Sequence, residues 1–430
     1  MYRGLPRGIY ALFFAQVVHS IGNLVYPFLT LFLTQRLGYS SSVAGTFILV
    51  SSIAYIPGSL LGGKLVDTMG RKAVMIVTES IAAGLLLPCA FLGASPVVPW
   101  LIIATQFFFG AANPTHEAIV ADMTTGETRR VAYSLLYLGH NIGFSIGPML
   151  AGFLFTRALP WLFIGDVIST FLALALVFIM VPESKPTEEE MARHGEKAVH
   201  ERAETGGLLP VLLKRPFLIA FSFISLLLTF VYSQHTFSLP LQLEATFPER
   251  GPVFYGTLMT VNALAVIFFT TPVIAATRRL KPVLAMALSA VLFTVGFGMI
   301  YFLNVMALFV VSTLVWTAGE ILQATNVNVY IAGHTPISHR GRFNAILPII
   351  FGAGLALGPA VMGNVIDAVG IRPVWLIAAV LSAVSAVALY VLYLLESRRD
   401  RLSGDPEASR EEGVDLPPGA VQDTPAAPEG

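Results

Sequence analysis

The chain has 430 residues, of which 55% are hydrophobic and only 12% are charged, about half the roughly 25% of charged residues in a typical soluble domain. Together with a mean hydropathy of +0.74, this composition excludes a water-soluble globular protein and makes the lipid bilayer the relevant solvent. The formal net charge is zero, so there is no basic excess of the kind that indicates a nucleic-acid partner.

The first apolar run is too long to be a signal peptide. It covers residues 8–33, which is 26 residues, whereas the apolar part of a secretory signal has roughly 7 to 15. We therefore predict a retained first membrane helix. The single cysteine, Cys89, lies in a later apolar run and excludes an intramolecular disulfide and a cysteine-based metal site.

Apolar runs of about 20 residues predict twelve membrane helices. Helices are favoured over barrel strands because the runs lack alternating polarity and because lipid leaves unpaired backbone groups without partners. The first six are predicted near 8–34, 42–66, 73–93, 97–122, 131–156 and 160–181, and the second six near 217–243, 252–276, 282–303, 305–332, 343–367 and 373–396. The predicted fold is an all-α polytopic membrane protein made of two six-helix bundles.

The two sets of helices are separated by a polar segment. Residues 182–216 contain six Lys or Arg and seven Glu, which predicts a solvated linker. The tail, rich in Pro, Glu, Gly and Ala, is predicted to be disordered. The predicted organisation is an N-terminal bundle, a cytoplasmic linker, a C-terminal bundle and a disordered cytoplasmic tail at 1–181, 182–216, 217–396 and 397–430.

The distribution of positive charge predicts the orientation. If both termini are cytoplasmic, 22 of the 26 Lys and Arg lie on the cytoplasmic side, as the positive-inside rule requires. We therefore expect a multi-pass protein of the plasma membrane, which in a bacterium is the inner membrane.

An internal repeat relates the two halves. Four Gly or Pro residues of the fifth helix recur in the eleventh at an offset of 211, pairing Gly143, Gly147, Pro148 and Gly152 with Gly354, Gly358, Pro359 and Gly363. Glu183 and Glu396 stand in similar short motifs at an offset of 213. The glycines favour close helix packing, and the duplication predicts two homologous bundles with a solute site between them.

The loop after the second helix carries a motif, Gly63-Lys64-Leu65-Val66-Asp67-Thr68-Met69-Gly70-Arg71-Lys72. It resembles the signature G-x-L-a-D-r-x-G-r-k of the major facilitator superfamily, from which it departs at Thr68. The resemblance covers about 1–396 and implies a twelve-helix transporter. In that family the acid and the arginine form a latch with an acid at the end of helix four, which implies a latch of Gly63, Asp67, Gly70, Arg71 and Asp122. The alternative is that the basic residues only obey the positive-inside rule.

The fifth helix is similar to the pattern G-x-x-x-G-P-x-x-G-G of drug:proton antiporters in this superfamily. Gln106 replaces the arginine that those antiporters carry in helix four. The MdtH-like multidrug efflux proteins also lack that arginine, and residues 112–130 look like theirs. The resemblance implies multidrug efflux by proton antiport, although the copy in the eleventh helix leaves general close packing as an alternative.

Polar side chains within the predicted helices mark the candidate site, because a charged residue near a helix centre costs about 2.5 to 3.5 kcal/mol on insertion scales. The candidates for proton coupling are Glu320, Asp166 and Glu117. The candidates for a substrate cavity are His19, Asn23, Tyr26, Gln106, Asn113, Tyr137, His140, Asn141, Tyr232, His235, Asn262, Trp316 and Gln323. For each of them, helix packing or an interhelical hydrogen bond is the alternative. Glu79 is expected to face the Asp67/Arg71 cluster or the membrane interface.

The sequence thus predicts a proton-coupled transporter that exports amphipathic organic molecules by alternating access. Its expected partners are a small organic substrate, protons and the lipid bilayer, with no nucleic acid, cofactor or metal, and a monomer is expected. The alternatives are a proton-coupled transporter of a specific small metabolite and a transport-inactive receptor or scaffold. An enzyme is not expected, because the sequence has no metal, nucleophile or phosphate-loop constellation.

Overall fold

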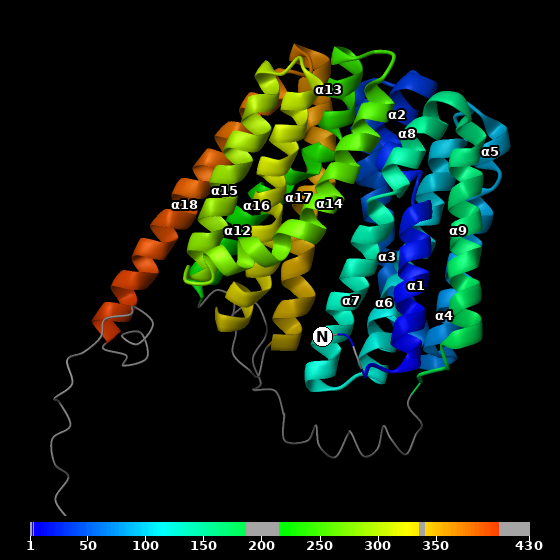
Figure 1. The fold of residues 1–430 in the computed structure, drawn as a ribbon, viewed down its shortest axis with the longest axis horizontal. Coiled ribbons are helices and arrows are strands. Elements are labelled where there is room, and N and C mark those ends of the chain that lie inside the picture. Colours follow the sequence, from blue (N-terminus) through cyan, green and yellow to red (C-terminus); the bar gives the residue numbers. More distant parts are fainter. Residues whose placement is uncertain (1, 3, 186–214, 335–339, 404–430) are drawn as a thin grey trace, which may run out of the picture.

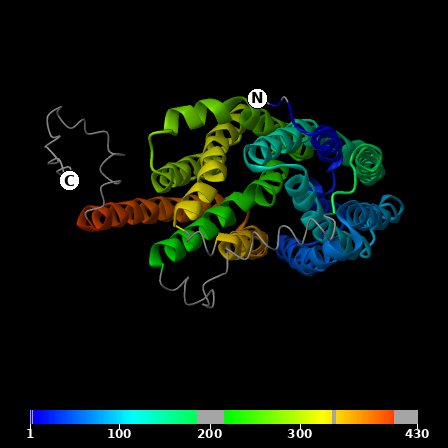
Figure 2. The same cartoon turned by 90° about the horizontal axis from the view of Figure 1, so that it is seen from below.

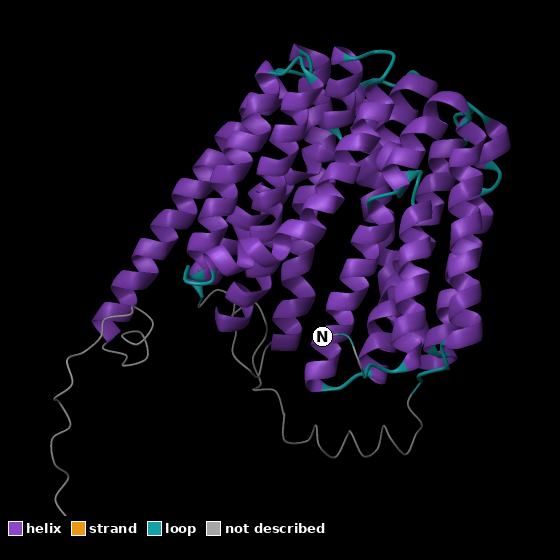
Figure 3. Ribbon diagram, in the orientation of Figure 1, coloured by secondary structure: helices purple, strands orange, loops and turns teal. Residues whose placement is uncertain are grey.

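The computed structural model describes residue 2 and residues 4–185, 215–334 and 340–403. Helices and their connecting loops make up this part of the chain (Figure 3). Most of the predicted linker and the tail after residue 403 lie outside the described residues.

Several long helices of the first bundle are interrupted, and Figure 1 shows how its elements follow one another. Its elements are α1 (Arg7–Gly22), η1 (Tyr26–Phe28), α2 (Leu29–Leu31), η2 (Phe32–Arg36), α3 (Ser41–Met69), α4 (Arg71–Leu86), α5 (Cys89–Leu92), α6 (Val98–Met123), α7 (Gly126–Phe144), α8 (Gly147–Arg157) and α9 (Leu159–Met180).

The second bundle repeats this plan. Its elements are α12 (Pro216–Tyr232), η4 (Ser233–His235), α13 (Ser238–Thr246), α14 (Gly251–Thr277), α15 (Pro282–Met299), η5 (Ile300–Phe302), α16 (Met306–His334), α17 (Arg340–Val369) and α18 (Pro373–Ser403). The predicted all-helical fold of two six-helix bundles is confirmed. The predicted end of the last helix was wrong: α18 continues beyond residue 396 to Ser403, because no Gly or Pro interrupts it before Gly404.

One crossing helix is less apolar than the others. Eleven segments of the described chain are long and apolar enough to span a membrane, and α6 is the crossing helix that is not among them. Its polar residues Gln106, Asn113, His116 and Glu117 lower its hydropathy, yet it packs against α3 and α4. The polarity of α6 therefore points to a role other than contact with lipid.

The first helix of each bundle is broken near its middle. α1 ends at Gly22 before the short turn η1, and α12 ends at Tyr232 before η4. Discontinuous helices at equivalent positions of two repeats are typical of transporters, whose solute sites lie near such breaks.

The two bundles meet mainly through two sets of helix contacts, α3 with α17 and α14 with α7 and α8, and α2 also contacts α13. Figure 1 shows the ribbons converging at the end that bears the loops 37–40, 247–250 and 370–372, which we call the far face. They separate toward the opposite end, which holds the N-terminus and the start of the linker and which we call the linker face. Figure 2 shows the bundles side by side from that end.

Hydrogen bonds join the bundles at the far face. The carboxylate of Asp367 on α17 accepts bonds from the backbone N–H groups of Ser41 (3.0 Å) and Ser42 (2.9 Å) at the start of α3. Thr30 Oγ1 donates to the carbonyl oxygen of Thr236 at 3.3 Å. The structure is therefore closed at the far face.

Two equivalent glycines allow this closure. A Cβ atom on Gly45 would collide with the carbonyl oxygen of Pro359, and one on Gly256 would collide with that of Pro148. Gly45 and Gly256 are 211 residues apart, and so are Pro148 and Pro359, which is the offset found in the sequence. The repeated glycines thus place two backbones in direct contact at each interface between the bundles.

Candidate functional site

Solvent reaches the space between the bundles on the linker side of these contacts. Tyr137 on α7 is 48% exposed and Tyr26 is 43% exposed, yet each lies near the other bundle. Tyr137 interacts electrostatically with Glu320 on α16, and Tyr26 interacts with Tyr255 on α14. These side chains therefore face a space between the bundles that a solute could enter.

A carboxyl group of the second bundle lies at this space. Asn262 Nδ2 on α14 donates to Glu320 Oε2 at 2.7 Å and lies 3.0 Å from Thr317 Oγ1. The hydroxyl of Tyr232 on α12 also interacts with the Glu320 carboxyl group. We call Tyr137, Tyr232, Asn262 and Glu320 the Glu320 cluster. It brings an ionisable group and two polar partners of one bundle close to a tyrosine of the other.

The other predicted cavity residues differ in their accessibility. Asn113 and His140 are exposed, whereas His19, Asn23, Gln106 and His235 are partly buried. His140 Nδ1 lies 3.1 Å from Ser20 Oγ, which ties the exposed ring to α1. The exposed residues are therefore the ones that a solute could contact in this conformation.

Three predicted cavity residues are packed inside their own bundle. Trp316 is fully buried, with its ring stacked 5.6 Å from that of Phe297. Gln323 is 8% exposed, and Asn141, at 7%, donates to the carbonyl of Tyr137 on its own helix at 2.9 Å. In this conformation these side chains contribute to packing and offer no surface to a solute.

Asp166 stabilises the break in the first helix. It is 5% exposed, and its Oδ2 accepts backbone bonds from Leu24 at 3.2 Å and Val25 at 3.3 Å. These N–H groups follow the end of α1 and are outside its hydrogen-bond ladder. The N–H of Leu24 also reaches the carbonyl oxygen of Gly22 at 2.7 Å, so Val25 depends on Asp166 more than Leu24 does. The carboxylate therefore has a structural task, which a sequence without a visible helix break could not reveal.

The contacts of Asp166 predict a stability difference between two substitutions. Asp166→Asn keeps an oxygen acceptor, so this variant is expected to unfold at a temperature close to that of the wild type. Asp166→Val leaves the buried N–H of Val25 unpaired and removes one of the two acceptors of Leu24, and it is expected to cost about 1 to 3 kcal/mol. Thermal unfolding in detergent micelles measures the difference, and equal losses in both variants would contradict the acceptor role.

Glu117, the third predicted coupling acid, is exposed on α6. The hydroxyl of Tyr133 on α7 donates to its Oε2 at 2.8 Å. Its neighbour His116 makes a different contact, because His116 Nε2 lies 2.8 Å from Glu79 Oε1 on α4. The expectation that Glu79 faces Asp67 and Arg71 or the membrane interface was wrong, since its side chain is only 5% exposed and pairs with α6.

The predicted latch is partly formed at the linker face. Arg71 Nε donates to Asp122 Oδ2 at 2.9 Å, while Asp67 is exposed and makes no hydrogen bond or ion pair with any residue that the structure describes. Gly70 has a φ of +97°, which favours glycine in the tight turn. At Gly63 there is space for a side chain, because no atom lies within 4 Å of the position that a Cβ would take.

Sequence reasoning missed the contacts that Glu183 makes with these residues. Its carboxylate accepts the backbone N–H groups of Arg71 (2.9 Å) and Lys72 (3.2 Å) at the start of α4. Ser184 Oγ donates to Asp122 at 3.2 Å. The signal for this contact was the short motif that recurs at the end of the twelfth helix.

The recurrent motif of the second bundle forms a related contact. His334 Nε2 lies 3.4 Å from Glu396 Oε1, beyond the apolar span of α16, which ends at Ile331. Burial lowers the pKa of His334, but the hydrogen bonds to Glu396 and to the carbonyl of Tyr330, together with the charge of Glu396, outweigh burial, so the pKa is raised above its usual value. The pair therefore contributes most to stability at low pH, and this contribution is lost as the pH rises through the raised pKa.

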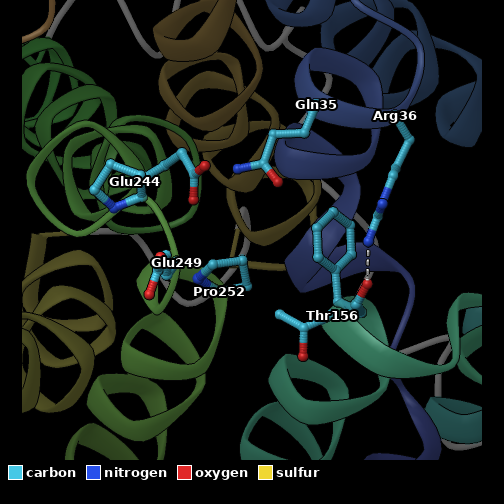
Figure 4. Close-up of a pocket in the computed structure, with 8 residues that line it drawn as sticks. Gln35, Arg36, Thr156, Glu244, Glu249 and Pro252 are labelled. Atoms are coloured by element: carbon cyan, nitrogen blue, oxygen red, sulfur yellow. Dashed lines mark hydrogen bonds between the residues drawn. The ribbon is translucent and has the colours of Figure 1, made fainter.

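A cavity of about 440 Å³ lies between the bundles at the far face (Figure 4). Arg36 Nη2 donates to the carbonyl oxygen of Phe155 at 2.5 Å, and the guanidinium lies 4.9 Å from the centre of that ring. The cavity is lined by Gln35, Arg36, Phe155, Thr156, Glu244, Pro248, Glu249 and Pro252. These residues come from both bundles, so opening of the far face would separate them.

Known proteins resemble this chain in sequence over most of its length. The sequence model of the Major Facilitator Superfamily matches residues 12–320 and again 250–418. An uncharacterized MFS-type transporter of Bacillus subtilis (strain 168), YqjV, is 28% identical over 85% of this chain and 88% of its own length. A Na(+), Li(+), K(+)/H(+) antiporter of Planococcus maritimus is 24% identical over 78% of this chain and 84% of its own.

A solved structure has the same fold. The crystal structure of the peptide transporter POT in complex with sulfate superposes with a TM-score of 0.72 at 14% identity, covering 94% of this chain and 96% of that one. At this identity the likeness concerns the fold alone.

Proposed function

The chain belongs to the Major Facilitator Superfamily, and we propose that it is a transporter that exports amphipathic organic molecules in exchange for protons. As a member of a transporter family it is a multi-pass membrane protein and not an enzyme. The observation that carries the proposal is the Glu320 cluster. It is an ionisable carboxyl group at a solvent-reached space between two bundles that can rock against each other.

Exchange follows if the proton and the solute compete for the same carboxyl group. The ionised Glu320 attracts a cationic solute, and protonation removes that attraction. Movement of the site between the two membrane faces then couples the two flows, because each occupant is released when the other binds. The name of the Planococcus maritimus relative, an antiporter of alkali cations and protons, supports proton exchange here.

The side chains around the site support an aromatic, weakly polar solute. Tyr26 and Tyr137 offer exposed rings, and cations bind to aromatic faces. None of the predicted cavity residues is Lys or Arg, so they provide no cation to hold a phosphate or another anion. An organic cation fits these groups better than a polyanion does.

The charge distribution supports an orientation with both termini in the cytoplasm of a bacterial cell, in its plasma membrane. With 22 of 26 Lys and Arg on that side, the linker face would be cytoplasmic and the structure would be open to the cytoplasm. We further propose that residues 1–181 and 217–396 move as two bodies within one monomer, joined by the linker.

Transport by the purified protein in lipid vesicles tests the function. The probes are tetraphenylphosphonium as an organic cation and K⁺ as an alkali cation, each added under an imposed pH difference. Exchange predicts that the organic cation moves against the proton flow. Movement with the protons would indicate symport of a metabolite-like solute, K⁺ movement alone would favour alkali-cation exchange, and no movement of either by folded protein would favour a receptor. Each of these three results would contradict the proposal.

We also propose that Gly63, Asp67, Gly70, Arg71 and Asp122 act as a conformational latch. Because Asp67 has no partner in the part of the chain that the structure describes, Asp67→Asn should leave this conformation intact and destabilise only the alternative one. Asp122→Asn removes the bond to Arg71 and should act on the present conformation. Cysteine labelling at both faces measures the two shifts, and shifts of the same sign would contradict the assignment.

A further inference from the structure

The first bundle contains a buried acid–base pair that the proposed exchange does not use. Glu79 on α4 is 4% exposed, and its Oε1 lies 2.8 Å from His116 Nε2 on α6. The side chain of His116 is 40% exposed. One member of the pair is thus sealed in the bundle, while the other is open to solvent.

The chemistry of this pair suits reversible proton binding. With Glu79 ionised and His116 neutral, the ring donates its Nε2–H to the carboxylate and leaves Nδ1 free as an acceptor. A proton that binds at Nδ1 produces an imidazolium facing a carboxylate, so the buried charge of Glu79 gains a partner. A buried carboxylate without a charged partner is strongly disfavoured in a membrane segment.

Other ionisable groups surround the pair. His19 on α1 interacts electrostatically with both members, and its Nδ1 is buried without a hydrogen-bond partner among the described residues. His19 also interacts with His140 on α7, which is exposed. A series of interacting ionisable side chains therefore runs from the pair on α4 and α6, through His19 on α1, to His140 on α7.

The remaining neighbours lie on the side of α6. Glu117, next to His116 in the chain, interacts electrostatically with it and accepts a hydrogen bond from Tyr133 of α7. Tyr55 of α3 interacts with Glu117. An exposed carboxylate thus stands beside the exposed imidazole, where a proton from water would arrive.

We propose that Glu79 and His116 form a second proton-binding site, located in the first bundle and loaded from solvent through His116. It adds a proton-binding site in the first bundle to the one proposed at Glu320 in the second. The use of this proton in transport rests on the proposed function, but its binding does not. One cycle could then move two protons.

Infrared spectroscopy of the full chain in lipid vesicles tests the site without any solute. Difference spectra between about pH 5 and 8, the range in which histidine titrates, report carboxyl and imidazole bands. We expect Glu79→Gln to remove a titrating component that the matched control Glu249→Gln, at an exposed far-face carboxylate, retains. His116→Gln should shift or remove the same component and serves as the test if Glu79→Gln fails to fold.

The same spectra in Glu320→Gln separate this inference from the proposed function. The component assigned to Glu79 should persist there, while a different component disappears. If Glu79→Gln and His116→Gln both give the wild-type difference spectrum, the second site does not exist, whatever happens at Glu320. If the wild-type spectrum contains the component that Glu79→Gln removes but none that Glu320→Gln removes, the coupling proposal fails and the Glu79 site stands.

Discussion

Glu320→Gln is expected to abolish accumulation of the solute in response to a pH difference, while folding is retained. Glutamine keeps the shape of the side chain and an oxygen for the bond from Asn262, but it cannot ionise or carry a proton. We expect at least about a tenfold loss of pH-driven accumulation, which corresponds to about 1.4 kcal/mol. Binding of the solute should also lose its pH dependence between about pH 5 and 8.

Flux assays and binding titrations in vesicles measure both effects. The matched control is Glu117→Gln, which removes an exposed carboxylate of the first bundle. It should retain accumulation. If Glu320→Gln still concentrates the solute and Glu117→Gln does not, the coupling carboxyl group is Glu117 and the assignment of Glu320 is wrong.

Gly45→Ala and Gly256→Ala are expected to open the far face. In each case the new Cβ atom collides with a backbone carbonyl of the other bundle, that of Pro359 or Pro148. A backbone atom cannot turn aside as a flexible side chain can, so the closed far face loses about 1 to 3 kcal/mol. Such a loss shifts the balance between two conformations by about 5- to 150-fold.

Labelling of an introduced cysteine measures this shift in a Cys89→Ala background. Thr30→Cys is a suitable reporter because Thr30 is 2% exposed at the closed far face. The control is Gly84→Ala, since no atom lies within 4 Å of a Cβ at Gly84. Equal labelling of Thr30→Cys with Gly45→Ala and with Gly84→Ala would contradict the role of the glycine contacts.

Features that depend on the polarity or spacing of one segment were predicted from the sequence. The crossing helices follow from runs of apolar residues, and the offset of 211 found in the sequence reappears in the contacts of Gly45 and Gly256. The Arg71–Asp122 bond was reached through the family motif. To predict each of these features, it is enough to know the order of residues along the chain or a motif. How one helix is rotated against another does not have to be known.

Contacts that depend on how a helix is rotated could not be predicted. Trp316 and Glu320 stand one turn apart on α16, yet the first packs inside the bundle and the second reaches the Glu320 cluster. The pairing of Glu79 with His116 requires knowledge of which faces of α4 and α6 meet. The role of Asp166 requires knowledge of where the first helix breaks.

The bond between Asp367 and the start of α3 bears on the speed of the transport cycle. Its carboxylate and the two N–H groups of Ser41 and Ser42 lie in an exposed region, so water can satisfy all three groups as soon as they part. Breaking this contact leaves no buried polar group unpaired. This contact therefore adds little to the barrier between the two conformations, and we expect them to exchange on the microsecond to millisecond timescale of domain movements. Under the proposed exchange, the proton gradient then selects the direction.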